Sequence, residues 1–229
     1  MRTPADLSAL LSRRFPLRHF TLTVAGRVLE LCSAKSIDEL IDRISEDQFS
    51  VDERMPYWAD VWHSAVALAE HMSESPDIVA GKDILDIGCG LGVPGIMAAL
   101  LGARVTFGDY DDDALLAAEM NLATNAPRFE ASFTCIDIRH KPQRKWDVVL
   151  AADIVYEHRM IDPARAFLRH AVTEDGCFVL AEPNRSVAED FVQSLDNIGF
   201  KVEQVERGAW LHDRLVHVSI YTGRRRHSE

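Results

Sequence analysis

The sequence predicts an α/β protein with a doubly wound, mostly parallel sheet. Three observations predict this fold class. Short apolar runs alternate with helical patterns from residue 84 onward. These runs are continuously apolar, which is typical of strands that are buried on both faces of a parallel sheet. A glycine-rich turn follows the first run, at the position where a doubly wound sheet places its ligand.

The first 55 residues are less regular, and we expect them to form a small N-terminal extension. Residues 20–31 alternate apolar and polar side chains around Ala25-Gly26-Arg27, which predicts a hairpin. Residues 36–44 start with Ser36 and repeat apolar side chains at helical spacing, which predicts a capped helix. The extension should therefore be a hairpin followed by a helix.

Residues 56–223 are expected to form the main domain. A helical pattern over 62–72 ends at Ser75-Pro76-Asp77, and strands and helices alternate after it. We expect strands over 84–87, 104–108, 131–136, 148–151, 177–181, 200–205 and 215–221, and helices over 94–101, 112–125, 162–172 and 186–198. Residues 224–229 begin with three arginines and are expected to form a solvated basic tail.

Composition narrows the classes of function. The net charge of −11 argues against a nucleic-acid partner, which would need clustered positive charge. No apolar run reaches the ~20 residues that a membrane helix needs, and the N-terminus lacks a signal pattern. We therefore expect a cytoplasmic protein without a membrane partner. The four cysteines and nine histidines show no metal-binding spacing, so we expect no metal site.

The strongest chemical signal is the segment Asp86-Ile87-Gly88-Cys89-Gly90-Leu91-Gly92. It lies between an expected strand and a helix that opens with Pro94, a residue favoured in the first helical turn. The glycines permit a tight turn and allow a ligand to approach the backbone closely. The carboxylate of Asp86 suits a ligand that carries an ammonium group. We therefore predict a ligand-binding turn rather than a simple connection.

A second signal ends the next expected strand. Asp109 can accept hydrogen bonds from both hydroxyls of a ribose, and Tyr110 is placed to pack near a base. The pattern Gly90-x-Gly92-x-x-Gly95 also satisfies the dinucleotide-binding fingerprint, so a nicotinamide enzyme is a formal competitor. The negative charge of Asp86 counts against that alternative, because a diphosphate would meet it at this turn.

A third signal is the apolar strand that ends in Ala151-Ala152 and is followed by Asp153 and Tyr156. The carboxyl ends of parallel strands meet at one edge of a sheet, so these side chains should lie on the same rim as the glycine turn. The small side chain of Ala152 leaves space for a ligand. We expect Asp153 and Tyr156 to be catalytic rather than a helix cap and a packed ring.

Residues 57–206 resemble the class I S-adenosylmethionine-dependent methyltransferases, which have a Rossmann-like seven-stranded sheet. Asp153-Ile154-Val155-Tyr156 matches the D-x-x-Y motif of a protein-lysine methyltransferase group, and Tyr57-Trp58-Ala59-Asp60-Val61-Trp62 matches that group as well. The resemblance implies S-adenosyl-L-methionine as cofactor and S-adenosyl-L-homocysteine as product. The expected cofactor contacts are Trp62, Asp86, Gly88, Cys89, Gly90, Asp109, Tyr110, Asp137 and Ala152.

The resemblance also implies which part of the cofactor each group holds. Asp86, Gly88 and Gly90 would hold the methionine end, Asp109 the ribose, and Asp137 would lie near the adenine amino group. Glu182-Pro183-Asn184-Arg185 matches the group only loosely, and the first 55 residues align with little of it. Because these regions usually shape the acceptor site of the class, we expect residues 1–55 to cover that site.

The sequence thus predicts transfer of a methyl group to a lysine amine of a protein partner. Tyr156 and Trp58 would line a channel that desolvates the amine, and Asp153 would orient the amine by accepting its hydrogen bond. Two alternatives stay open, because a fold alone does not fix a function. They are a small-molecule N- or O-methyltransferase on the same fold and a non-enzymatic nucleotide-binding protein.

Overall fold

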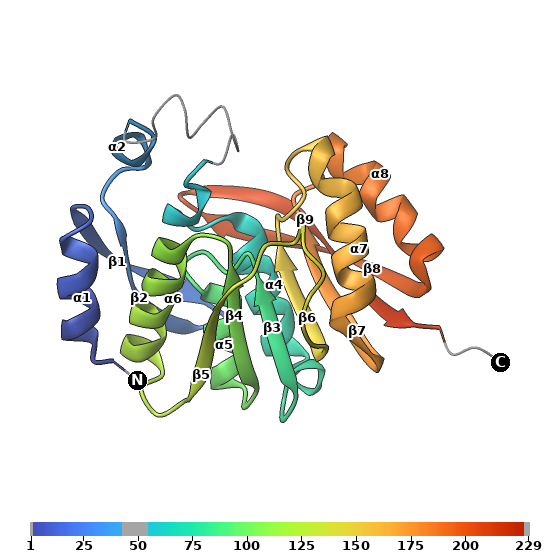
Figure 1. Cartoon of the computed structure of the whole chain (residues 1–229), viewed down its shortest axis with the longest axis horizontal. Helices are drawn as coiled ribbons and strands as arrows, with labels where there is room; N and C mark the ends of the chain where they lie inside the picture. Colours follow the sequence, from blue (N-terminus) through green and yellow to red (C-terminus); the bar gives the residue numbers. More distant parts are fainter. Residues whose placement is uncertain (1, 43–54, 227–229) are drawn as a thin grey trace.

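A seven-stranded sheet with helices on both faces organises the main part of the chain (Figure 1). The structure is a computed structural model that describes residues 2–42 and 55–226. The strand order is β5-β4-β3-β6-β7-β9-β8, and within this sheet β9 is the strand that runs antiparallel to its neighbours. The predicted doubly wound, mostly parallel sheet is confirmed.

The alternation of strands and helices follows the order expected from the sequence. The strands of the sheet are β3 (Asp83–Ile87), β4 (Arg104–Asp109), β5 (Ala131–Cys135), β6 (Trp146–Ala152), β7 (Val172–Glu182), β8 (Phe200–Leu211) and β9 (Arg214–Arg225). The helices are α4 (His63–Glu74), α5 (Val93–Leu100), α6 (Asp112–Asn125), α7 (Ile161–Ala171) and α8 (Ser186–Ser194), with 3-10 turns η1 (Tyr57–Ala59), η2 (Pro76–Ile78), η3 (His158–Met160) and η4 (Leu195–Ile198). No helix in the described ranges combines the length and apolar character needed to cross a membrane.

Each face of the sheet carries its own apolar layer. In β6, Val148 and Leu150 belong to the layer that includes α4, α5 and α6, whereas Val149 and Ala151 belong to the layer that includes α7 and α8. Successive side chains of a strand point to opposite faces, so a strand that is covered on both sides must be apolar throughout. This is the physical reason why the strands appear in the sequence as continuous apolar runs.

The N-terminal extension packs against α6, at one side of the main domain (Figure 1). Its elements are α1 (Pro4–Ser12), β1 (Leu17–Val24), β2 (Arg27–Ala34) and α2 (Ile37–Ile41). β1 and β2 pair antiparallel around Ala25 and Gly26, which both have positive φ, as a two-residue hairpin turn requires. Asn121 of α6 binds this hairpin, because its Oδ1 accepts from the Cys32 N–H at 2.7 Å. The predicted hairpin is confirmed and is longer than expected.

The helices of the extension differ from the prediction in one respect: α1 was not predicted. Its signal is a capping box, in which the Thr3 hydroxyl accepts from the Asp6 N–H and the Asp6 carboxylate accepts from the Thr3 N–H. The helix predicted over 36–44 corresponds to α2, and Ser36 caps it as expected. Residues 43 and 44 lie outside the described residues.

The two C-terminal strands extend well beyond their predicted bounds. β8 and β9 form a hairpin that closes on His212 and Asp213, which have φ of +50° and +56°. A Cβ on Gly208 would lie 2.9 Å from Leu215 Cδ1, so the glycine leaves room for the leucine across the strand pair. The charged residues and the glycine in the second half of β8 hid this strand from a pattern-based prediction.

The predicted basic tail over 224–229 begins too early. Arg224 and Arg225 are the last residues of β9. The Arg225 guanidinium donates to the carbonyl oxygens of Val172 at 3.0 Å and Thr173 at 3.2 Å, and it lies over the Phe200 ring at 5.2 Å. These contacts order the arginine, because its planar donors find several acceptors at once. Residues 227–229 lie outside the described residues.

Candidate functional site

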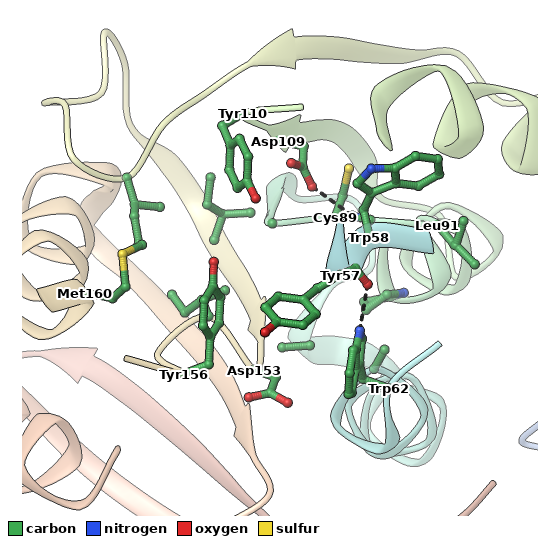
Figure 2. A pocket seen from close by; sticks show the side chains of 18 of the residues that line it. Tyr57, Trp58, Trp62, Cys89, Leu91, Asp109, Tyr110, Asp153, Tyr156 and Met160 are labelled. Carbon is green, nitrogen blue, oxygen red and sulfur yellow. Dashed lines mark hydrogen bonds between the residues drawn. The ribbon is translucent and has the colours of Figure 1, made fainter. Parts of the chain in front are cut away.

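A cavity of about 450 Å³ lies at the carboxyl ends of β3, β4 and β6 (Figure 2). Its volume suits a small-molecule ligand, and its place is the one that doubly wound sheets use for binding. All of the predicted site residues except Asp86 line it: Trp62, Gly88, Cys89, Gly90, Asp109, Tyr110, Asp137, Ala152, Asp153 and Tyr156. The structure therefore brings three separate sequence signals to one cavity.

The turn between β3 and α5 lines one end of the cavity, here called the loop end (Gly88, Gly90, Asp109 and Tyr110). The φ angles are +64° at Gly88 and +51° at Gly90, a backbone region that side chains rarely adopt. A Cβ on Gly88 would also lie 3.2 Å from Ile154 Cγ2. The glycines are therefore needed for the path of the turn, and they leave its backbone open toward the cavity.

Gly95, the third glycine of the fingerprint, has a packing role. It lies inside α5, where a Cβ would overlap the ring of Phe107 and come within 2.8 Å of Asp86 Oδ2. The absence of a side chain lets α5 pack directly on β4, which carries Phe107. This fixes the start of α5 next to the glycine turn.

Asp86 is the predicted site residue that does not line the cavity. Its side chain is buried beneath the turn, and its Oδ2 accepts from the Gly95 N–H at 2.9 Å. Burial and the nearby charge of Asp109 raise the pKa of Asp86 to about 8, although the Gly95 hydrogen bond lowers it. Asp86 therefore supports the start of α5. The prediction overlooked that a carboxyl group ending a buried strand can accept from the helix that follows.

Asp109 lies at the end of β4 with its carboxylate held by the backbone. Its Oδ2 accepts from the Gly90 N–H at 3.0 Å and its Oδ1 from the Asp111 N–H at 3.1 Å. Burial raises the pKa of Asp109 to about 6, although these hydrogen bonds lower it. Each carboxylate oxygen can accept more than one hydrogen bond, so Asp109 can still receive the hydroxyls of a bound ligand.

Two of the backbone donors at this turn are already engaged. A diphosphate binds at a helix N-terminus through its free N–H groups. Here the Gly90 N–H donates to Asp109 and the Gly95 N–H donates to Asp86. Two buried carboxyl groups thus take the place of a diphosphate. This geometry argues against the nicotinamide alternative.

The loop end continues to the segment after β5, where Ile136, Asp137 and Ile138 line the cavity together with Tyr110. The Asp137 carboxylate accepts from the backbone N–H of Arg139 at 2.9 Å and from its guanidinium Nη2 at 2.7 Å. Apolar side chains and a tyrosine ring beside a carboxylate suit a flat heterocycle that carries an amino group.

The other end of the cavity is here called the Asp153 end (Tyr57, Asp153, Tyr156 and Arg185). The Tyr57 and Tyr156 rings meet edge to face at 5.4 Å, and Trp62 lies on the other side of Tyr57 at 5.9 Å. The indole N–H of Trp62 donates to the carbonyl oxygen of Tyr57 at 2.9 Å. Figure 2 shows these rings beside the Asp153 carboxylate. This end combines an aromatic surface with one carboxylate and one guanidinium group.

Trp58 lies elsewhere than predicted within the cavity. A Cβ on Gly90 would lie 3.5 Å from the backbone of Trp58, so this residue belongs beside the loop end and not beside Tyr156. Its ring packs against Phe15 of the N-terminal extension at 5.6 Å. The predicted aromatic pair of Tyr156 and Trp58 is therefore replaced by Tyr156 and Tyr57.

Asp153 is held by a partner that the sequence did not suggest. It has a positive φ of +55°, and its side chain is 8% exposed. The Arg185 guanidinium donates to both of its oxygens, from Nε to Oδ1 at 2.8 Å and from Nη2 to Oδ2 at 2.8 Å. Such a bidentate ion pair fixes the plane of a carboxylate as well as its position.

Sequence reasoning thus missed Tyr57 and Arg185 as site residues. Tyr57 belongs to the segment 57–62 that matched the methyltransferase group, but the prediction gave site roles to Trp58 and Trp62 only. Arg185 follows β7, the strand that pairs with β6 and so ends beside Asp153. A charged residue just after that strand was the available signal for Arg185.

Comparison with known proteins places the chain among related sequences. The profile of a family described as lysine methyltransferase matches residues 48–198. The electron transfer flavoprotein beta subunit lysine methyltransferase of Danio rerio is 33% identical over 139 residues, 59% of this chain and 53% of that protein. The chain thus spans about half the length of that relative. The EEF1A lysine methyltransferase 3 of Mus musculus is 32% identical over 180 residues, 76% of this chain and 75% of that protein.

Solved structures show the same fold at low sequence identity. The Thermus thermophilus 16S rRNA N2 G1207 methyltransferase, solved with AdoMet and guanosine, aligns with a TM-score of 0.63 and 18% identity, covering 92% of this chain and 51% of that chain. The Bradyrhizobium japonicum N-methyltransferase NodS, solved with S-adenosyl-l-homocysteine, aligns with a TM-score of 0.57 and 15% identity, covering 83% of this chain and 98% of that chain. At these identities the likeness supports the fold class alone.

Proposed function

The chain belongs to the lysine methyltransferase family, and from this premise we propose that it transfers a methyl group from S-adenosyl-L-methionine to a lysine amine of a protein. One observation carries the proposal. A single cavity joins the loop end, which suits a nucleoside, to the Asp153 end, which suits an amine. A methyltransferase needs these two sites to adjoin, because the nucleophile must approach the methyl carbon from the side opposite the sulfur.

The loop end fits the cofactor in several ways. The backbone at Gly88 and Gly90 faces the cavity, Asp109 can accept the ribose hydroxyls, and Tyr110 and Asp137 can receive the adenine with its amino group. Cys89 and Ala152 add small side chains to the cavity lining, and Trp62, just before α4, lines the cavity beside Tyr57. Asp86 is left out of the direct contacts, since it supports the loop through Gly95. When bound, the cofactor supplies a methyl group that is already activated by its sulfonium.

The Asp153 end must present the acceptor amine in its neutral form. A lysine with a pKa of ~10.4 is mostly protonated at neutral pH, and removing its proton there costs about 4.6 kcal/mol. The rings of Tyr57 and Tyr156 give this end an apolar surface. An acceptor side chain that packs against this surface loses water, and desolvation lowers the pKa of an amine. Asp153 then orients the amine by accepting its N–H. Burial raises the pKa of Tyr156, so its hydroxyl keeps its proton.

The acceptor class rests on the family and on charge. Both relatives described above are named for protein lysines, and the net charge of −11 favours a basic protein segment over a nucleic acid. We also propose that the protein is cytoplasmic and that residues 1–55 cover the acceptor site. The second point is supported by Arg18 of β1, which donates to Asp60 of the cavity lining at 2.9 Å.

The test is incubation with S-adenosyl-L-methionine labelled in its methyl group and a cell lysate, followed by separation of protein from small molecules. We expect label in the protein fraction, released on acid hydrolysis as methyllysine. Label in the small-molecule fraction alone would establish the small-molecule alternative. Tight binding of S-adenosyl-L-homocysteine without any transfer would instead indicate a nucleotide-binding protein.

A further inference from the structure

The pair of Asp153 and Arg185 is a feature of the cavity that the proposed transfer does not yet explain. Asp153 directly follows β6, and Arg185 directly precedes α8, 32 residues later in the chain. Both side chains line the cavity, and two hydrogen bonds of 2.8 Å join them. A carboxylate that must receive an amine is therefore already paired with a cation of the same chain.

The segment between β7 and α8 is built to hold Arg185 in this place. Asn184 has a positive φ of +60°, and its Oδ1 accepts from the Ser219 hydroxyl at 2.7 Å. Its Nδ2 donates to the carbonyl oxygen of His217 at 3.3 Å, and this hydrogen bond connects the segment between β7 and α8 to β9. The Arg185 N–H donates to Glu182 Oε1 at 3.2 Å. The position of the guanidinium is thus fixed by two neighbouring strands.

Glu182 lies behind the pair as a buried carboxyl group. It is 2% exposed, and its Oε2 has no hydrogen-bond partner among the described residues. Burial and the charge of Asp153 raise the pKa of Glu182 to about 8, so at pH 7 it is mostly neutral. Among the other charged residues of the lining, Glu157 forms an ion pair with Arg159, and Asp60 forms one with Arg18. The cluster of Asp153, Arg185 and neutral Glu182 therefore has no net charge.

This balance matters for an amine that must react as a neutral nucleophile. An unpaired carboxylate within ~4–6 Å favours the charged form of its neighbour and shifts a pKa by 1–3 units. An Asp153 without Arg185 would therefore bind the lysine as an ammonium, which has no lone pair to attack the methyl carbon. With Arg185 in place, Asp153 keeps lone pairs for an N–H while its charge is balanced.

We propose that Arg185 is a positioning residue that fixes the carboxylate of Asp153 and cancels its charge, so that this end of the cavity receives the acceptor as a neutral amine. This inference rests on the proposed function and deepens it. It also assigns a role to Glu182-Pro183-Asn184-Arg185, the segment that matched the family motif only loosely.

The test needs no acceptor protein. Sinefungin carries a primary amine, protonated at neutral pH, where the cofactor carries its methyl group, so it places an ammonium at the point of transfer. We compare its affinity with that of S-adenosyl-L-homocysteine by calorimetry, using the full chain and the variants Arg185→Gln, Arg185→Lys and Arg185→Gln/Asp153→Asn. The ratio of the two affinities cancels changes in the fold and at the loop end, because both ligands share the rest of their structure.

In Arg185→Gln the ratio should rise in favour of sinefungin by about tenfold, the equivalent of one pKa unit. It should stay near the wild-type value in Arg185→Lys, which keeps the charge, and in the double variant, which lacks the carboxylate charge. An unchanged ratio in Arg185→Gln would overturn the inference, as would a rise that persists in the double variant. If wild-type protein binds neither ligand, the proposed function itself fails.

A second readout measures the rate of methyl transfer to the lysate protein fraction that takes up label in the test of the proposed function. In Arg185→Gln the acid limb of the pH–rate profile should move to higher pH. Without the guanidinium, the negative charge of Asp153 is no longer balanced and raises the pKa of the bound amine. Arg185→Lys should restore the wild-type profile. A uniform loss of rate at every pH in Arg185→Gln would show a merely structural role and overturn the inference.

Discussion

The two ends of the cavity are built in different ways. At the loop end, Gly88 and Gly90 lie in the turn that follows β3, and Asp109 ends the adjacent parallel strand β4. The backbone N–H of Gly90 donates to the Asp109 carboxylate and so joins the turn to that strand. At the Asp153 end, Tyr57, Asp153 and Arg185 come from three distant segments. Tyr57 contacts Tyr156, three residues after Asp153, and Arg185 donates to the Asp153 carboxylate. The first end is set by backbone geometry, whereas the second depends on long-range pairing. Substitutions at the loop end should therefore act on ligand affinity, and substitutions at the Asp153 end on transfer.

The largest effect should come from Asp153→Ala. Loss of the carboxylate removes the group that orients the amine, and misplacement of a nucleophile by about 1 Å can lower a rate on the order of 100-fold. We expect transfer of labelled methyl groups to fall by at least that factor, while the affinity for S-adenosyl-L-homocysteine changes less than about threefold. Asp77→Ala, on an exposed carboxylate in η2, is the matched control and should match wild type. Equal loss of affinity and rate in Asp153→Ala would show that the two ends are not separate in function.

The next effect should come from Asp109→Ala. This change removes the acceptor for two ribose hydroxyls, and a hydrogen bond to a charged group contributes about 1.5–3 kcal/mol. We expect the affinity for S-adenosyl-L-homocysteine to fall between about 10-fold and 100-fold by calorimetry. Asp112→Ala, an exposed carboxylate in the first turn of α6, is the control. Wild-type affinity in Asp109→Ala would remove the ribose role from this residue.

Gly95→Ala tests whether backbone packing sets the loop end. The added Cβ overlaps the Phe107 ring and crowds Asp86, and overpacking of a core costs about 1–3 kcal/mol. We expect the free energy of unfolding in urea to fall by that amount. The added change Phe107→Leu makes room and should return part of the loss, as a double-mutant cycle would measure. A Gly95→Ala protein as stable as wild type would mean that α5 shifts freely on β4.

The smallest effect should be a pH dependence of binding at the loop end. The pKa of Asp109 is raised to about 6, and a ligand that donates hydroxyls prefers the ionised carboxyl group. Affinity for S-adenosyl-L-homocysteine should therefore be full above this pKa and fall as the pH drops through it, by up to about tenfold per pH unit. Asp109→Asn should bind more weakly and show a flat profile over the same range. A wild-type profile that is flat between pH 5 and pH 7 would contradict this assignment.

Much of the fold could be predicted because its signals are local. α6 has the predicted bounds because Asp111 caps it and because residues 114–123, which are mostly apolar, are all buried. β6 was found because it is covered on both faces and so is continuously apolar from Val148 to Ala152. The second half of β8, at the edge of the sheet, escaped prediction because Glu206, Arg207 and Gly208 interrupt its apolar pattern. α1 escaped because its signal, a capping box at Thr3, lies at the very start of the chain.

The candidate site divides in the same way. Gly88, Gly90 and Asp109 were found because a turn motif and a strand end are visible in contiguous sequence. The burial of Asp86 was missed because the motif shows a carboxyl group but not the helix N–H that it accepts from. Arg185 was missed because its pairing with Asp153 depends on β6 and β7 lying side by side. Sequence patterns reveal local geometry, and tertiary pairing decides which side chains share a cavity.

The central claim is that the loop end and the Asp153 end form one continuous site for methyl transfer. A crystal structure of the chain with S-adenosyl-L-homocysteine tests it most directly. We predict that the ribose hydroxyls bind Asp109, that the adenine lies beside Tyr110, and that the sulfur faces Asp153 and Tyr156. A nucleoside bound outside this cavity, or bound with its sulfur turned away from Asp153, would contradict the account.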